Sequence, residues 1–141
     1  MTKNEQANTQ EIIELAESGD PEAQFKYGVM LEEGLVVKRN PILAEKMYKL
    51  SEEQGYVPSM YNHAVLLRDG YDVPKNLTEA ARLFKIAADN NDPKAQYNLG
   101  LMLMTGEGVI RDEASAIQYF KLASEQNIIH AQYQYAIALK D

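Results

Sequence analysis

Residues 23–34 are AQFKYGVMLEEG, and residues 95–106 are AQYNLGLMLMTG, a second copy of the same pattern. Residues 59–70, SMYNHAVLLRDG, lie midway between these copies, and residues 131–133, AQY, begin a fourth one. Successive copies therefore start 36 residues apart, at positions 23, 59, 95 and 131. A fixed period of this length is typical of an array of stacked repeats and not of a domain closed around one core.

Composition limits the classes of function that the chain can have. The chain has 141 residues, of which 45% are hydrophobic, enough for a continuous core. A formal net charge of −7 argues against the phosphate-binding surface that nucleic acids need. The absence of cysteine excludes disulfides and thiolate metal sites and fits a reducing compartment. No signal-peptide core and no run of about 18 apolar residues is found. We therefore expect a cytoplasmic protein that neither binds nucleic acid nor inserts into a membrane.

Each period predicts two antiparallel helices, because its apolar residues fall at helical spacing with helix breakers between them. We expect the first helix of each unit, helix A, at residues 21–33, 57–69, 93–105 and 129–140. We expect the second helix, helix B, at residues 41–53, 77–89 and 113–125. Small residues such as Gly28 and Ala44 are expected to let the A and B helices of a unit approach closely.

Turn and capping residues support these helix boundaries. Asp20-Pro21 and Asp92-Pro93 each place an N-cap acceptor before a proline at the first helical position. A glycine follows three of the A helices, where a left-handed residue commonly ends a helix: Gly34, Gly70 and Gly106. The B helices are expected to begin after the N-caps Asn40, Asn76 and Asp112.

The pattern as a whole predicts an all-α fold, a right-handed α-solenoid of antiparallel helix pairs with a 36-residue period. Residues 1–8 are expected to form a tail, and residues 9–19 a capping half-repeat with a B-like helix. Three repeats follow at residues 20–55, 56–91 and 92–127. Residues 128–141 form a half-repeat with an A helix, which either caps the stack or belongs to a longer array.

The units share the pattern A-Q-[FY]-x-x-G-x-x-L-x-x-G, followed by a loop valine at Val37, Val73 or Val109. This pattern resembles the Sel-1-like repeat (SLR) family, which is related to the tetratricopeptide repeats, over about residues 20–140. Ala64 and Ala136 depart from it by replacing the helix-A glycine. The resemblance implies a superhelix whose concave surface, lined by the A helices, binds partner proteins.

One side of helix A is the expected binding surface. Turning the helix by 100° per residue puts Ala23, Tyr27, Gly28 and Leu31 on the core side. The other side carries an aromatic ring in every unit, and rings of this kind suit the capture of a peptide. The expected partner-binding residues are Phe25, Val29 and Glu32; Tyr61, Val65 and Arg68; Tyr97, Leu101 and Met104; and Tyr133 and Ile137. The alternative is that the rings pack between adjacent A helices.

Nothing in the sequence indicates an enzyme or a cofactor. His63 occupies the place of Tyr27 and Leu99, so it is interpreted as a variant of a packing position. His130 has no neighbours at metal-ligand spacing, and no pair of carboxylates stands out as a general acid and base. We expect a non-catalytic adaptor or scaffold that binds a protein or peptide. The alternative is a structural segment of a longer repeat protein, with self-association end to end.

Overall fold

The computed structural model describes residues 2–140. Every regular element in this part of the chain is an α-helix, which confirms the all-α prediction. The helices are α1 (Lys3–Glu17), α2 (Pro21–Glu33), α3 (Pro41–Glu52), α4 (Val57–Asp69), α5 (Leu77–Asp89), α6 (Pro93–Thr105), α7 (Glu113–Glu125) and α8 (Ile129–Leu139).

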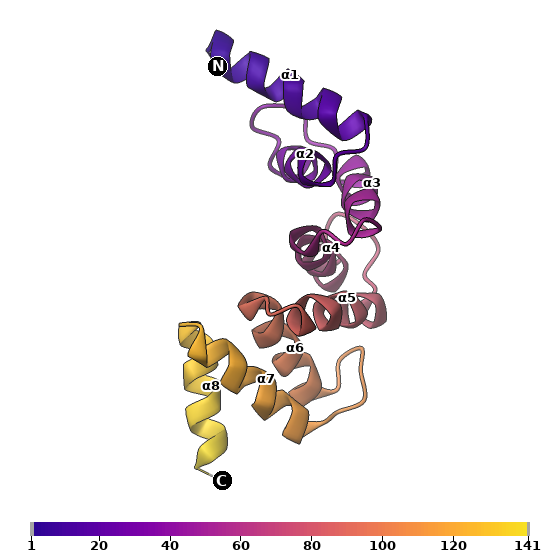
Figure 1. Ribbon diagram of the computed structural model, residues 1–141. Coiled ribbons are helices and arrows are strands. Elements are labelled where there is room, and N and C mark those ends of the chain that lie inside the picture. Colours follow the sequence, from indigo (N-terminus) through magenta and orange to yellow (C-terminus); the bar gives the residue numbers. More distant parts are fainter. Residues whose placement is uncertain (1, 141) are drawn as a thin grey trace.

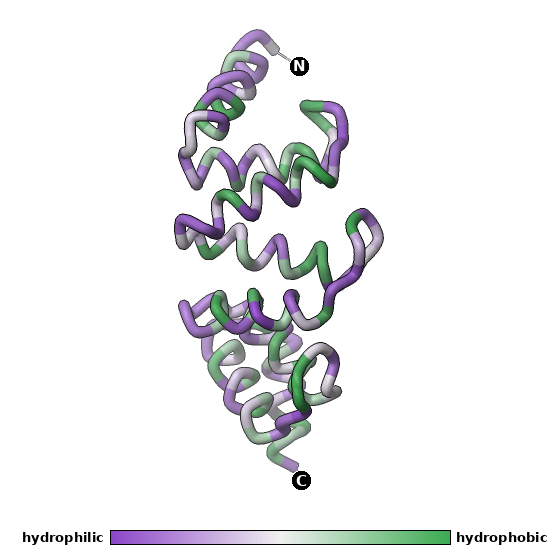
Figure 2. The backbone as a smooth tube through the Cα atoms, turned by 90° about the vertical axis from the view of Figure 1, so that its right-hand side faces the viewer, coloured by the Kyte–Doolittle hydropathy of each residue, from purple (hydrophilic) through white to green (hydrophobic). Residues whose placement is uncertain are grey.

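The helices form a curved stack in chain order, with the two termini at opposite ends (Figures 1 and 2). The A helices are α2, α4, α6 and α8, the B helices are α3, α5 and α7, and each helix packs mainly on its neighbours in the chain. In Figure 1, α2 and α4 lie on the inner side of the curve, and α3 and α5 lie on its outer side. The stack therefore has the α-solenoid architecture that the 36-residue period predicts. None of the helices described is long and apolar enough to cross a lipid bilayer.

Side-chain caps start the helices where the sequence predicts. The Oδ2 of Asp20 accepts a hydrogen bond from the backbone N–H of Ala23 at 2.8 Å, ahead of the proline that begins α2. Asp92 caps α6 in the same way. The three B helices begin after the caps Asn40, Asn76 and Asp112. These caps satisfy amide groups that the first turn of a helix leaves without partners.

A glycine in the left-handed region ends each of the first three A helices. The φ angles are 68° at Gly34, 67° at Gly70 and 79° at Gly106. A residue with a Cβ rarely adopts this conformation, so glycine is needed where the chain turns from helix A into the loop that leads to helix B.

Aromatic rings from the B helices form the centre of each repeat. Tyr48, Phe84 and Phe120 are fully buried. A Cβ added to Gly28 would lie 2.5 Å from the Cε1 of Tyr48, and a Cβ added to Gly100 would lie 2.5 Å from the Cε1 of Phe120. The glycine thus lets the ring of Tyr48 pack closely on α2, and Ala44 of the same B helix is also fully buried.

The first helix is longer than the sequence interpretation allows. It begins at Lys3, within the segment 1–8 that was expected to be a tail. The Oγ1 of Thr2 accepts from the backbone N–H of Glu5 at 3.1 Å, and the backbone N–H of Thr2 donates to the Oε2 of Glu5 at 3.0 Å. This reciprocal capping box is recognisable in the sequence as Thr-x-x-Glu and accounts for the earlier start.

Candidate interaction surface

The residues predicted to bind a partner all lie on the A helices, three each on α2, α4 and α6 and two on α8. Their exposure differs along the stack. The rings of Phe25, Tyr61 and Tyr97 are half-buried, whereas Tyr133 is 65% exposed and Ile137 is 41% exposed. The predicted residues therefore occur on all four A helices, and those on α8 are the most exposed.

Each half-buried ring packs against a ring of the B helix in its own repeat. The ring centroids are 6.3 Å apart for Phe25 and Tyr48, and 5.8 Å apart for Tyr61 and Phe84. Phe25 also lies 5.6 Å from the ring of Tyr56, the residue before α4. The ring of Phe25 therefore fills the junction with the next A helix, as the packing alternative predicts.

The same arrangement recurs in the third repeat. The centroid of Tyr97 lies 6.0 Å from that of Phe120 and 6.1 Å from that of His130, which belongs to α8. One side of each of these rings thus packs against other rings of the fold, and the rest of the ring is partly exposed.

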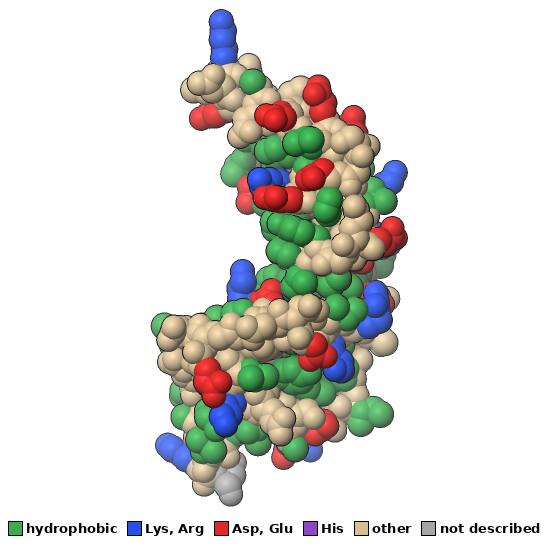
Figure 3. Space-filling view, viewed as in Figure 1, with side chains coloured by type: hydrophobic (Ala, Val, Ile, Leu, Met, Phe, Trp, Pro, Cys, Tyr) green, Lys and Arg blue, Asp and Glu red, His purple; other side chains and the backbone are tan. Residues whose placement is uncertain are grey.

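A groove of about 370 Å³ lies between α4 and α6. It is lined by Arg68, Asn98, Leu101, Met102, Thr105 and Glu107. Two of these residues, Arg68 and Leu101, were predicted as partner-binding residues. The space-filling view shows hydrophobic, acidic and basic side chains along the hollow that the curved stack makes (Figure 3).

Basic and amide side chains border this inner groove. The Nη1 of Arg68 donates to the Oδ1 of Asn98, and the guanidinium lies 5.8 Å from the centroid of the Phe84 ring. The ammonium of Lys94 lies 5.1 Å from the centroid of Tyr61. Cations over ring faces are held by the ring quadrupole, so both charges are fixed beside the groove.

Glu32, at the N-terminal end of the same face, is tied into the core. Its Oε1 accepts a hydrogen bond from the hydroxyl of Tyr48 at 2.5 Å. Burial raises the pKa of Glu32, and the charge of Asp72 adds to this, against the opposing effects of the Tyr48 hydrogen bond and of Arg39. Only part of this predicted residue is therefore available to a partner.

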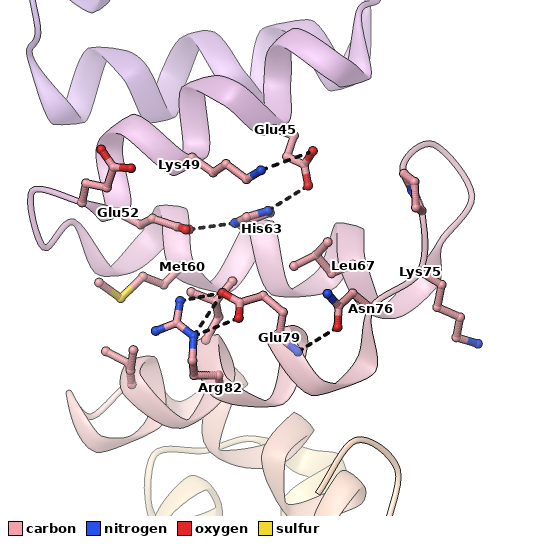
Figure 4. Close-up of a pocket in the computed structure, with 14 residues that line it drawn as sticks. Glu45, Lys49, Glu52, Met60, His63, Leu67, Lys75, Asn76, Glu79 and Arg82 are labelled. Carbon is pink, nitrogen blue, oxygen red and sulfur yellow. Dashed lines mark hydrogen bonds and ion pairs between the residues drawn. The ribbon is translucent and has the colours of Figure 1, made fainter.

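A second and larger groove of about 720 Å³ lies between α3 and α5, with α4 beneath it. His63 of α4 is buried there, with its side chain 2% exposed. Its Nδ1 lies 2.9 Å from Glu52, and its Nε2 lies 3.0 Å from Glu45. Figure 4 shows the imidazole between these two carboxylates of α3, while Glu79 and Arg82 pair with each other on α5, at the opposite wall of the groove.

Two carboxylates around one imidazole favour the imidazolium, which donates a hydrogen bond from each ring nitrogen. Burial is the largest influence on the pKa of His63 and lowers it. The hydrogen bonds and charges of Glu52 and Glu45 outweigh burial, so the pKa lies above its ordinary value. The cluster is therefore a buried ionic contact between the first and second repeats.

The position of His63 as a packing residue was predicted, but its partners were not. At the interface between the second and third repeats, the positions 36 residues after Glu45, Glu52 and His63 are apolar. They hold Ala81, Ala88 and Leu99. Polar residues thus replace apolar ones at all three places of a single interface. Comparing Glu45 and Glu52 with their repeat equivalents would have revealed this.

The ionisable groups around His63 are paired with one another. Both carboxylates nearest His63 are engaged with its ring, and Glu79 is engaged with Arg82. In residues 2–140 no group of three or more metal-ligating side chains is placed to hold an ion.

Three consecutive matches to the Sel1 repeat model cover residues 21–56, 57–92 and 93–128. The chain belongs to the Sel1 repeat family. Sel1 repeats generally mediate protein–protein interactions and are typically not catalytic. The matched repeats begin one residue later than the boundaries expected from the sequence.

Solved structures support the assignment. A Sel1 repeat protein from Oxalobacter formigenes is 25% identical with a TM-score of 0.83, covering 92% of this chain and 97% of that one. A protective antigen of uropathogenic Escherichia coli strains, which displays an SLR fold, is 33% identical with a TM-score of 0.80 over 84% of this chain. This chain spans only 25% of that antigen. Cysteine-rich protein B of Helicobacter pylori shares the fold, with a TM-score of 0.69 at 19% identity over 92% of each chain. No curated protein sequence matches the chain.

Proposed function

We propose that this Sel1 repeat chain is a non-catalytic scaffold that binds a peptide segment of a partner protein along its inner face. The groove between α4 and α6 carries the proposal, because it combines the apolar side chains of Leu101 and Met102 with the polar groups of Arg68 and Asn98. Binding sites commonly have this combination of apolar lining and a few directed polar groups.

The size of the inner groove favours a peptide as the ligand. A volume of about 370 Å³ accepts a few side chains and not a folded domain. The half-exposed rings of Tyr61 and Tyr97 lie on the same face, one on each of the two helices that border the groove, and extend the contact area. Rings that are already packed on one side lose little conformational freedom when a ligand covers the other side.

Charge gives the peptide a direction. Arg68, which also pairs with Asp69, and Lys94 lie beside the groove. The helix α2 carries Glu22, Glu32 and Glu33 against the single basic residue Lys26. We expect an acidic group of the partner near Arg68 and a basic segment toward α2, because complementary charges fix the register of a bound chain.

The proposal is tested with Thr105→Arg, which fills the groove from an exposed position without removing a buried side chain. Its matched control is Thr78→Arg, the same change at an exposed position of the B helix α5. Partners captured from cell lysate are compared by quantitative mass spectrometry, and circular dichroism verifies that both variants fold. Proteins retained by the wild type and Thr78→Arg but lost by Thr105→Arg support binding at the inner face. Retention of the same proteins by Thr105→Arg contradicts it.

A further inference from the structure

The junction between α3 and α4, where the first repeat meets the second, lacks a hydrogen bond that the other junctions of this kind have. At each of those junctions a glutamine of helix A donates through its Nε2 to a backbone carbonyl in the last turn of the helix before it. The bonds run from Gln24 to Ala16 at 3.3 Å, from Gln96 to Ala88 at 3.2 Å and from Gln132 to Ser124 at 3.2 Å. The equivalent place on α4 holds Met60, whose side chain has no N–H group to donate. The α3–α4 junction therefore forms without this tie.

The side chains buried in the α3–α4 junction are also more polar than those in the α5–α6 junction. Ser51 and Ser59 are fully buried, and their Oγ atoms share a hydrogen bond of 2.6 Å. Their equivalents 36 residues on, Ala87 and Ala95, are equally buried and apolar. The cluster of His63, Glu45 and Glu52 shows the same difference, because its equivalents are Leu99, Ala81 and Ala88. Each of these places is thus polar at one junction and apolar at the next.

A stack of repeats opens first where the contact between neighbours costs least to break. Separating α3 from α4 exposes hydroxyl, imidazole and carboxylate groups, which water solvates, whereas separating α5 from α6 exposes alanine and leucine side chains. The inner sides of the two junctions both keep a contact between successive A helices: Phe25 packs on Tyr56 at the first, and Arg68 donates to Asn98 at the second. The contact of helix A with the preceding helix B therefore makes the α3–α4 junction the weaker of the two.

We propose that the stack opens at the α3–α4 junction, with α1–α3 as one segment and α4–α8 as the other, and that protonation of His63 favours the closed form. In the closed form the imidazolium donates to both Glu45 and Glu52. Once the ring loses a proton, one of these carboxylates has no donor and the two negative charges repel each other. Opening therefore becomes easier as the pH rises. This inference does not depend on the peptide-binding function proposed for the inner groove.

His63 is the group that makes the junction sensitive to pH. The charged groups around it are Glu45, Lys49, Glu52 and Glu53 of α3, Lys75 of the loop after α4, and Glu79 and Arg82 of α5. Carboxylate, lysine and arginine side chains ordinarily keep their charges between about pH 6 and pH 9, whereas an imidazole does not. In addition, Arg82 is paired with Glu79, and the Nζ of Lys49 is 4.0 Å from Glu45. These cations therefore do not replace the proton that His63 loses.

The test uses single buried thiols, because the chain contains no cysteine of its own. Ser59→Cys places a thiol in the α3–α4 junction, and Ala95→Cys places one at the matched position of the α5–α6 junction. A buried thiol reacts with an aromatic disulfide reagent only when its surroundings open, and an unfolded peptide with the same local sequence gives the intrinsic rate at each pH. Ser51→Cys and Ala87→Cys repeat the comparison from the B helices. Circular dichroism and urea unfolding verify that each variant folds.

After division by the intrinsic rate, the thiol of Ser59→Cys should react at least about tenfold faster than that of Ala95→Cys, since one missing buried hydrogen bond changes an opening constant by about this factor. Its reaction should depend less steeply on urea than global unfolding does, because opening one junction exposes less surface. The corrected rate should rise between about pH 6 and pH 9 in Ser59→Cys and stay level in Ala95→Cys. Ser51→Cys and Ala87→Cys should show the same order.

A control variant adds Glu45→Ala, Glu52→Ala and His63→Leu to Ser59→Cys and so copies the apolar α5–α6 junction around the same thiol. Its corrected rate should be lower than that of Ser59→Cys alone and should not change with pH. The proposal is overturned if the thiols at the two junctions react equally fast, or if the thiol of Ser59→Cys reacts only through global unfolding. A pH dependence that persists in the control variant overturns the role of His63.

Discussion

The Nδ1 of His63 lies 2.9 Å from a carboxylate oxygen of Glu52, across the interface between the first and second repeats. Glu45 faces the other ring nitrogen at 3.0 Å, and the Nζ of Lys49 lies 4.0 Å from Glu45. On the opposite wall of the groove, Arg82 holds the carboxylate of Glu79. The acidic groups nearest the imidazole thus come from α3, and they favour its protonated form.

This contact makes the stability of the chain depend on pH. The pKa of His63 in the folded state lies above its ordinary value of 6.5, so folding favours the bound proton. The stabilising contribution is fully present below pH 6.5 and is lost as the pH rises through the higher folded pKa. We expect the free energy of unfolding of the wild type to fall over this range relative to that of His63→Leu. Urea unfolding at a series of pH values measures the difference. Any contribution of His130 cancels in this difference, because both proteins contain it. Parallel pH profiles for the two proteins would contradict the prediction.

The neighbouring interface provides a replacement for the whole cluster. The variant Glu45→Ala, Glu52→Ala, His63→Leu copies Ala81, Ala88 and Leu99. His63→Leu alone should lower the free energy of unfolding by about 1–3 kcal/mol, because two partly buried carboxylates lose their donor. The triple variant should recover this loss and match or exceed the wild type, since apolar packing can replace a buried ionic contact without loss of stability. Urea unfolding near neutral pH measures the free energies of unfolding of the wild type, His63→Leu and the triple variant. A triple variant that is no more stable than His63→Leu would show that apolar packing does not replace the polar cluster.

The sequence predicts the fold far better than it predicts the sites. The caps Asp20 and Asp92 and the left-handed Gly34 act locally, so their positions along the chain suffice to place the helix ends. The cluster around His63 depends on which side chains meet across an interface. A 36-residue period gives the alignment of these side chains but not their contacts. The aromatic positions show the same limit, because Phe25 was placed on the correct helix while its packing against Tyr56 became evident only in three dimensions.

Gly28 provides a test of the close packing between the A and B helices. The hydroxyl of Tyr48 donates a hydrogen bond to Glu32 and accepts one from the Nδ2 of Asn62 at 3.4 Å. These two bonds hold the ring in place next to Gly28. Gly28→Ala should therefore lower the free energy of unfolding by about 1–3 kcal/mol through overpacking. The higher helix propensity of alanine, about 1 kcal/mol, offsets only part of this loss.

The third repeat supplies the matched control for Gly28→Ala. In Gly100→Ala the added methyl group meets Phe120, a ring without a hydroxyl to hold it, so the loss should be smaller. Adding Tyr48→Phe to Gly28→Ala should reduce the difference between the two repeats. Thermal and urea unfolding of the variants measure these effects. Equal losses in Gly28→Ala and Gly100→Ala would show that the Tyr48 hydrogen bonds do not restrain the ring.

The start of α8 can be strengthened by copying the two best-capped A helices. Ile128 is the N-cap of α8 and makes no side-chain capping bond, and Ile129 at the first helical position is 76% exposed. The double change Ile128→Asp and Ile129→Pro reproduces the Asp-Pro start of α2 and α6. It should stabilise α8 by about 1 kcal/mol, because the aspartate satisfies an orphan amide and proline needs no donor at this position. Hydrogen exchange of the α8 amides measures the gain directly. Ile128→Ala serves as the control and should give no added protection, since alanine cannot accept a hydrogen bond. Equal protection in the double variant and in Ile128→Ala would mean that packing on α7, and not the missing cap, sets the stability of α8.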